Sequence, residues 1–383
     1  MSLIIFIGGL LMGRIAPLSL RGRQRLYHIV LAAEIKLSGR GFFMFTPERF
    51  FDMVGFPSRP MILSWLFPRR KFPFRFVYSK DYWMLPVGKH VFPVKKYRLL
   101  HERLLAMGAG RDNFRLPSPA SDEDVLLVHT PRYVKKLKTG TLSGLEQQVL
   151  ELPFSPALVH FAWLSVGGTI LTAELALSEG VAVHLGGGFH HAFPDHGEGF
   201  CVLNDVAVAL EKMRHQGKIR KAMVVDCDLH QGNGTASILA GKPYAFTFSI
   251  HQMDIYPADK PPSSLDIGLW TGDGDEAYLA QLRSHFPKLY EQFQPDLVFY
   301  LAGADPYQGD QLGGLRLTKE GLRERDRIVL EEARRLGIPV AVVLAGGYAP
   351  DPEDVVSIHL NTIRAAQKAR RLSPGIRPAA PFV

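Results

Sequence analysis

Three polar residues alternate directly after the apolar stretch 222–225, as Asp226, Asp228 and His230. Alternate side chains of an extended chain point to the same side, so these three side chains are expected to lie together. Charged side chains are rarely buried unless they are paired or bind a metal, and the apolar stretch predicts a buried strand. A carboxylate and an imidazole on one side suit a divalent cation such as Zn²⁺. We therefore predict a metal site here, with Asp228 and His230 as two ligands.

A third metal ligand is expected at Asp305, which follows a second apolar stretch, Leu297–Leu301. Asp before Pro306 is also common in turns, but its place after a predicted strand favours a role in binding. Three protein ligands leave a fourth position open, as in catalytic zinc sites and unlike structural ones. Such a metal lowers the pKa of a bound water from about 15.7 towards about 7. The three residues thus predict hydrolytic chemistry.

Two adjacent histidines, His190 and His191, follow a run of three glycines and could transfer protons. Imidazole suits general acid–base work near neutral pH. Because two neighbouring rings resist double protonation, we expect one neutral and one charged ring at rest. Asp226 and Asn233 are placed in the sequence to orient these rings. The four residues form the predicted acid–base group.

Tyr348 follows Gly346 and Gly347, after a third apolar stretch. A phenol beside flexible glycines can move over a substrate and donate a hydrogen bond to a developing oxyanion. A buried structural tyrosine is the alternative interpretation of the same pattern. We predict the first role, because Tyr348 follows a strand end as the other polar residues do.

Five apolar runs of strand length alternate with helical stretches, which predicts a single α/β domain with a mostly parallel β-sheet and helices on both faces. Ligands of such sheets bind at the carboxyl ends of the strands, where all the polar residues above are found. The expected strands are Val181–Leu185, Ala222–Val225, Tyr244–Ile250, Leu297–Leu301 and Pro339–Leu344, with a shorter one at 76–78. The expected helices are Tyr97–Met107, Ala157–Ser178, Asn204–His215, Glu276–Phe293 and Lys319–Leu336.

Two details within this pattern carry further expectations. Gly167 and Gly168 fall in the middle of the predicted helix Ala157–Ser178 and should weaken it there. His129 ends the apolar run 126–129 and is expected to be a structural histidine rather than a ligand.

The positive charge of this chain is confined to its N-terminal part. The 383 residues include 45 Lys and Arg and 37 Asp and Glu, of which 11 and three lie in residues 1–72, so the remainder carries 34 of each. The net charge of +8 therefore indicates no nucleic-acid surface on the main domain. We expect a basic, apolar N-terminal extension over 1–72, the domain over 73–370 and a tail over 371–383.

The extension could contact an anionic membrane surface, because it mixes aromatic and basic residues. A poorly ordered leader is the plainer interpretation and the one we prefer. No basic residue precedes its apolar run 3–12, so a secretory signal is not expected. The two cysteines, Cys201 and Cys227, form no C-x-x-C pattern and fit a reducing compartment, so a cytoplasmic location is expected.

Together these motifs resemble the zinc-dependent histone deacetylase family, which shares its fold with arginases. The matching stretches cover about residues 74–370 and are Gly187-Gly188-Phe189-His190-His191-Ala192, Gly199-Phe200-Cys201-Val202-Leu203-Asn204-Asp205, Asp226-Cys227-Asp228-Leu229-His230-Gln231-Gly232-Asn233-Gly234, Ala302-Gly303-Ala304-Asp305-Pro306 and Ala345-Gly346-Gly347-Tyr348. The segment Gly88-Lys89-His90-Val91-Phe92-Pro93 also resembles the start of the family's domain.

The resemblance implies a role for each matching residue. Zinc would be held by Asp228, His230 and Asp305. His191 would be the main general base and acid, and His190, oriented by Asp226, its electrostatic partner. Phe200 would line the acyl channel together with Gly199, Gly346 and Gly347, and Tyr348 would polarise the amide carbonyl. The resemblance also implies a structural K⁺, with ligands from Asp226, Asp228, His230, Ser249 and Ile250.

One residue departs from the pattern of many family members, which have Asp where this chain has Asn233. In this respect the chain resembles the class IV branch and its bacterial relatives. An amide carries no negative charge, so His191 should be less basic than with an Asp partner. We expect Asn233→Asp to move the acidic limb of the pH–rate profile upward.

The predicted function is hydrolysis of an N-acyl-lysine in a protein or peptide, with removal of an acetyl or longer acyl group. A small-molecule amidohydrolase, for example one acting on acetylated polyamines, is the alternative, and the width of the channel mouth would separate the two. An arginase-like site is less favoured, because two bridged metals need more ligands than this sequence offers. A non-catalytic acyl-lysine binding module would require a lost ligand or tyrosine, and each of these is present.

Overall fold

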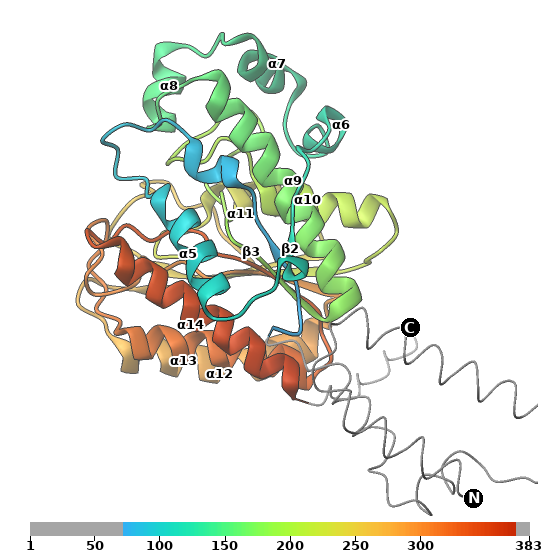
Figure 1. Cartoon of the computed structure of the whole chain (residues 1–383), viewed down its shortest axis with the longest axis vertical. Coiled ribbons are helices and arrows are strands. Elements are labelled where there is room, and N and C mark those ends of the chain that lie inside the picture. The colour runs from blue at the N-terminus through green and yellow to red at the C-terminus, as the bar shows by residue number, and fades with distance from the viewer. Residues whose placement is uncertain (1–71, 373–383) are drawn as a thin grey trace, which may run out of the picture. The chain divides into compact units, whose positions relative to one another are not determined.

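The computed structural model of the chain describes residues 72–372 (Figure 1). Almost all of the expected N-terminal extension, with its membrane-surface contact, and most of the expected C-terminal tail lie outside these residues. The described residues contain the whole of the predicted α/β domain, 73–370.

The described residues contain one eight-stranded sheet in which every pair of neighbouring strands is parallel. The order β2-β1-β3-β8-β7-β4-β5-β6 places the buried strands at the centre. This confirms the predicted fold class. The strands are β1 Phe76–Val77, β2 Phe114–Arg115, β3 Val181–His184, β4 Ala222–Asp226, β5 Ala245–Gln252, β6 Leu265–Leu269, β7 Leu297–Leu301 and β8 Val340–Val343.

Helices cover both faces of the sheet, as Figure 1 shows. α12, α13, α14 and α5 pack beside one another on one face, and α9, α10 and α11 on the other. The helices are α5 Lys95–Ala106, α6 Asp122–Val125, α7 Pro131–Thr139, α8 Gly144–Leu150, α9 Pro156–Glu179, α10 Asp205–His215, α11 Asn233–Leu239, α12 Asp275–Phe293, α13 Lys319–Arg335 and α14 Pro352–Arg371, with 3₁₀ turns η1 Lys80–Met84 and η2 Arg111–Asn113. Alternate strand residues supply the two cores, as Val224 and Val225 illustrate.

The two glycines in the middle of α9 do not interrupt it, contrary to expectation. A side chain at Gly168 would lie 2.5 Å from the His184 ring, and one at Gly167 would overlap the Ser118 carbonyl oxygen. The glycines therefore allow close packing, which compensates for their low helix propensity. α9 is long and apolar enough to cross a membrane, yet two thirds of its most apolar window is buried inside the domain, as in a core helix.

His129 is a structural histidine, as expected. Its Nδ1–H donates to the Phe193 carbonyl oxygen at 3.0 Å, and its Nε2 accepts the backbone N–H of Asn204 at 3.0 Å. Burial lowers the pKa of His129 to about 4. Between about pH 4 and pH 6.5, the His129 ring is therefore neutral in the folded protein but protonated in the unfolded chain, where its pKa is near 6.5.

The free energy of unfolding should consequently fall as the pH drops from about 6.5 towards 4. The His129 contribution amounts to about 2 kcal/mol by pH 5, since each unit of pKa shift is worth about 1.4 kcal/mol. We expect the loss between pH 7 and pH 5 to be smaller by this amount in His129→Gln, measured by denaturant unfolding. His215→Gln, at an exposed histidine, is the control. Equal pH dependence in His129→Gln and the wild type would contradict the prediction.

Candidate active site

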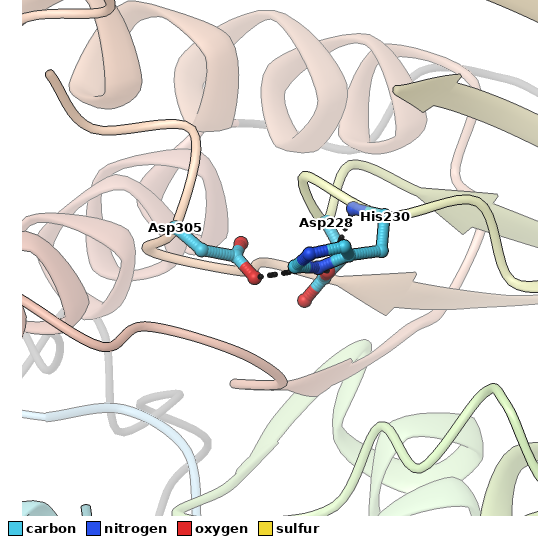
Figure 2. A group of neighbouring side chains, drawn as sticks. All are labelled: Asp228, His230 and Asp305. Atoms are coloured by element: carbon cyan, nitrogen blue, oxygen red, sulfur yellow. Dashed lines mark hydrogen bonds and ion pairs between the residues drawn. The ribbon is translucent and has the colours of Figure 1, made fainter. Parts of the chain in front are cut away.

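Three of the predicted ligands converge at the carboxyl ends of β4 and β7 (Figure 2). Candidate ligand atoms of Asp228, His230 and Asp305 all lie within 4.8 Å of one another, and all three residues are buried. His230 Nδ1 is 3.4 Å from Asp228 Oδ1 and 3.6 Å from Asp305 Oδ2. Asp228 and His230, which follow β4, thus lie close to Asp305, which follows β7, as the sequence predicted.

The cluster has the features expected of a cation site. Asp305 Oδ1 accepts the Leu229 N–H at 3.1 Å, whereas the buried Asp305 Oδ2 accepts no hydrogen bond. Burial and the neighbouring Asp228 carboxylate raise the pKa of Asp305 to about 7. Two buried carboxylates, one of which has an oxygen without a hydrogen bond, and an imidazole suit Zn²⁺ well. Three such ligands leave a fourth coordination position for substrate.

Glycine leaves the space in front of these carboxylates open. A Cβ at Gly346 would lie 2.7 Å from Asp228 Oδ2 and closer still to Asp305 Oδ2. The Gly346 N–H donates to Asp228 Oδ2 at 2.9 Å and orients that carboxylate. Gly347, with φ of +136°, lies against Ala304. Gly346, one of the three glycines predicted to line the channel, therefore also shapes the metal cluster, whereas Gly347 packs away from the pocket lining.

We expect Asp305→Asn to weaken Zn²⁺ binding by at least about 100-fold, because loss of a mere outer-shell partner already costs 10- to 100-fold. Competition with a fluorescent chelator measures the affinity directly. Asp259→Asn, at an exposed carboxylate, is the control. Unchanged affinity in Asp305→Asn would remove this residue from the ligand set.

His190 is paired with Asp226, as the sequence predicted. Its Nδ1 donates to Asp226 Oδ2 at 2.7 Å, and its Nε2 lies 3.7 Å from Asp228 Oδ1. Burial opposes protonation of this ring, but the Asp226 and Asp228 carboxylates outweigh it and raise the pKa of His190 to about 9. His190 is therefore the charged member of the histidine pair.

His191 has the opposite surroundings. Its Nδ1 donates to Asn233 Oδ1 at 2.7 Å, and the two histidine rings lie 4.1 Å apart between centroids. Burial and the charges of His190 and His230 lower the pKa of His191 well below its ordinary value. With Nδ1 bearing the proton, the lone pair is on Nε2. This ring is suited to accept a proton.

One pocket brings together both histidines, Asp228, His230 and Tyr348. The Phe200 and Tyr348 rings meet edge to face, with their centroids 5.8 Å apart. Gly199 and Gly346 also line the pocket. Phe200 has φ of +68°, an uncommon conformation that surrounding packing must hold. Its ring also contacts that of Phe92 at 6.2 Å. The pocket thus has aromatic walls and a polar base.

Two of the five residues predicted to hold K⁺, Asp228 and His230, belong to the metal cluster, and the other three lie on β4 and β5. Asp226 is opposite Ser249 in the β4–β5 register, and Ile250 follows on β5. Ser249 Oγ is 2.9 Å from His251 Nδ1. Potassium binding at this position stays a prediction.

Several residues that support the site were given no role from the sequence. Asp205 accepts the N–H groups of Gly188 and Phe189 and the hydroxyl of Thr169, and so fixes the loop that precedes His190. The Lys96 Nζ is buried and donates to the Ala345 carbonyl oxygen at 2.6 Å. A lysine in an amphipathic helix is ordinarily exposed, so pattern alone would not identify it.

Tyr256 and Glu198 also belong to the site without having been predicted. The centroid of the Tyr256 ring lies 5.0 Å from that of the His191 ring and 6.0 Å from that of the His230 ring. The Tyr256 hydroxyl donates to Glu198 Oε1 at 2.7 Å. Glu198 precedes the motif Gly199-Phe200-Cys201, which is the nearest clue to its position.

Comparison with known proteins decides the family. The histone deacetylase domain model matches residues 90–363, well over half of the chain. This chain belongs to the histone deacetylase family. An uncharacterized protein of the cyanobacterium Picosynechococcus sp. is 44% identical over 295 residues, which span 77% of this chain and 98% of that protein. Histone deacetylase 2 of Arabidopsis thaliana is 33% identical over 250 residues, which span 63% of this chain and 65% of that protein.

Solved structures support the fold of this histone deacetylase family member. The crystal structure of an HDAC homolog from Aquifex aeolicus matches with a TM-score of 0.66 and 24% identity, covering 78% of this chain and 85% of that chain. The expected family and fold are confirmed, and the coarse activity follows as that of a hydrolase of the deacetylase type.

Proposed function

We propose that this chain is a zinc-dependent hydrolase that removes acetyl or longer acyl groups from N-acyl-lysine in proteins or peptides. The supporting observation is one pocket lined by a charged and a neutral histidine, a tyrosine, and Asp228 and His230 of the metal cluster, which Asp305 completes. When bound to Asp228, His230 and Asp305, zinc would supply a Lewis acid and a water of lowered pKa.

The two histidines divide the proton transfer. His191 takes a proton from the attacking water at Nε2, because Asn233 holds the other ring nitrogen as a donor. His191 then returns that proton to the leaving lysine amine. His190 stays protonated against Asp226 and offers positive charge to the developing oxyanion without giving up its proton.

Tyr348 and the aromatic walls bind and orient the substrate. The Tyr348 hydroxyl is un-ionised, because burial and nearby carboxylates raise its pKa, so it can donate to the carbonyl oxygen as charge develops. The backbone of Tyr348 is held on both sides: its N–H donates to Asp310 Oδ2, and its carbonyl accepts from Gln311 Nε2, each at 2.6 Å. The rings of Phe92 and Phe200, which pack edge to face, form an apolar wall of the pocket that would contact the alkyl chain of an acyl-lysine.

Acyl release from lysine peptides that carry acetyl, longer acyl or no acyl groups tests this proposal. We expect hydrolysis that a chelator removes and added zinc restores. The preferred chain length then defines the acyl substrate. Activity that survives complete metal removal would contradict the proposal.

The same assay separates the protein substrate from a small amine. Acetylated polyamines are offered in parallel with the peptides, under identical zinc loading. Preference for the polyamines by kcat/KM would assign the site to a small-molecule amidohydrolase.

Cys201 and Cys227 are both free and buried, which supports our further proposal of a reducing, cytoplasmic location.

A further inference from the structure

Glu198 makes a set of contacts that the proposed mechanism has not used. Its Oε1 accepts the Nδ2–H of Asn233 at 2.6 Å and the hydroxyl of Tyr256 at 2.7 Å. Its Oε2 lies 3.5 Å from Nε2 of His196. One carboxylate oxygen thus contacts both the partner of His191 and an aromatic ring beside it.

These contacts fix the direction of the Asn233 amide. A carboxylate only accepts hydrogen bonds, so Glu198 must face the NH₂ group of Asn233. The Gly234 N–H donates to Asn233 Oδ1 at 3.0 Å, which requires the same orientation. Asn233 Oδ1 therefore faces His191 and accepts from its Nδ1 at 2.7 Å. The result is one directed chain of hydrogen bonds from His191 through Asn233 to Glu198.

The chain ends in a negative charge. The Glu198 side chain is 17% exposed. Burial favours its neutral form, but hydrogen bonds from His196, Tyr256 and Asn233 outweigh burial and lower the pKa of Glu198. A charged acceptor strengthens the hydrogen bond from the amide and polarises it. The negative charge that Asn233 lacks is thus carried by Glu198, the next residue in the hydrogen-bonded chain from His191.

We propose that Glu198 is a positioning residue that orients Asn233 and Tyr256 and supplies, through the Asn233 amide, the negative charge that an Asp partner would give His191 directly. This inference rests on the proposed function, in which His191 accepts the proton. It adds Glu198 to the acid–base group, as the residue behind His191 and Asn233.

Single substitutions at Glu198 test the role kinetically in the zinc-loaded full chain. Glu198→Gln keeps an acceptor oxygen but removes the charge, and Glu198→Ala removes both. We expect kcat to fall about 10-fold in the first and further in the second, with KM nearly unchanged, in line with other outer-shell partners. Glu353→Gln, at an exposed glutamate, is the control. Wild-type kcat in both Glu198 variants would overturn the proposal.

An exchange of the two side-chain types gives a sharper test. Asn233→Asp alone places two carboxylates at hydrogen-bond distance, where they repel. Asn233→Asp combined with Glu198→Gln restores one acid and one amide, with the charge now next to His191. We expect the double variant to be at least about 3-fold more active than Glu198→Gln, because residues in one network are not additive. A double variant whose activity is no higher than the product of the two single effects would count against the hydrogen-bonded chain from His191 to Glu198.

A spectroscopic measurement distinguishes failure of this inference from failure of the proposed function. The Nδ1-bound proton of His191 should give a low-field NMR signal in ¹⁵N-histidine-labelled protein, assigned by its loss in His191→Ala. Glu198→Ala should move this signal to higher field, because the acceptor amide is less polarised. The signal tests the chain even if the wild type hydrolyses no acyl-lysine. An unmoved signal would overturn the proposal whatever the activity.

Discussion

Replacing His191 with Ala is expected to lower kcat for N-acyl-lysine hydrolysis by about 10³-fold, since a positioned general base contributes 10²- to 10⁴-fold. The neutral ring accepts its proton at Nε2, and Asn233 occupies the other nitrogen. The remaining pocket residues cannot replace it, because His190 is already protonated against Asp226. Steady-state kinetics with an acetyl-lysine peptide measure the loss, and the zinc content of the same sample should equal that of the wild type.

The control for this variant is His160→Ala, which removes an exposed histidine outside the pocket and should leave kcat unchanged. Tyr348→Phe provides a second comparison, because it removes one hydroxyl and keeps the ring packed against Phe200. Loss of one oxyanion donor costs about 10²- to 10³-fold in kcat. If His191→Ala retained its zinc and kept wild-type kcat, His191 would not be the base.

Replacing Asp205 with Ala is expected to lower the free energy of unfolding by about 3 kcal/mol. The fully buried carboxylate accepts the Phe189 N–H at 2.8 Å, the Gly188 N–H at 3.0 Å and the Thr169 hydroxyl at 2.5 Å. Each buried donor left without an acceptor costs about 1–3 kcal/mol. Removal of the buried carboxylate itself offsets part of this cost, because burial raises the pKa of Asp205 and disfavours its charged form. Denaturant unfolding, followed by circular dichroism, measures the difference.

The same substitution should also abolish hydrolysis, since the loop that Asp205 fixes continues into His190 and His191. Asp205→Asn keeps one acceptor oxygen and should lose roughly half as much stability. Asp259→Ala, at an exposed position, is the control and should change neither quantity. An Asp205→Ala protein as stable as the wild type would show that other groups fix the loop.

The central part of the fold was predictable because its signals are local. β3, β4, β5, β7 and β8 are almost wholly buried and mostly apolar, since both faces of the sheet are covered. The edge strands were missed for the opposite reason. β2 has only two residues, and β6 is half-exposed and includes Asp266, so neither forms an apolar run. Gly167 and Gly168 were misread because their packing partners, Ser118 and His184, are distant in the sequence.

The candidate site likewise contains residues that were predictable from the sequence and residues that were not. Asp228 and His230 were predictable because alternation in one strand end determines where they point, and Asp305 because parallel strands end at one edge. Glu198 lies 35 residues from Asn233 and 58 from Tyr256, and its contacts depend on loops whose course no periodicity encodes. Lys96 was not predicted for a similar reason, because its partner Ala345 is 249 residues away.

The position of β8 in the sheet has a consequence for the synthesis of the protein. β8 pairs with β3 on one side and with β7 on the other, so it alone joins the β2-β1-β3 strands to the β7-β4-β5-β6 strands. His190 and His191 follow β3, whereas the three metal-cluster residues follow β4 and β7. Until residues 340–343 have left the ribosome, the edges of β3 and β7 therefore lack the partner strand that the native sheet gives them. Chaperones that shield such edges should bind this chain during translation, and its active site should form only in the last stage of folding.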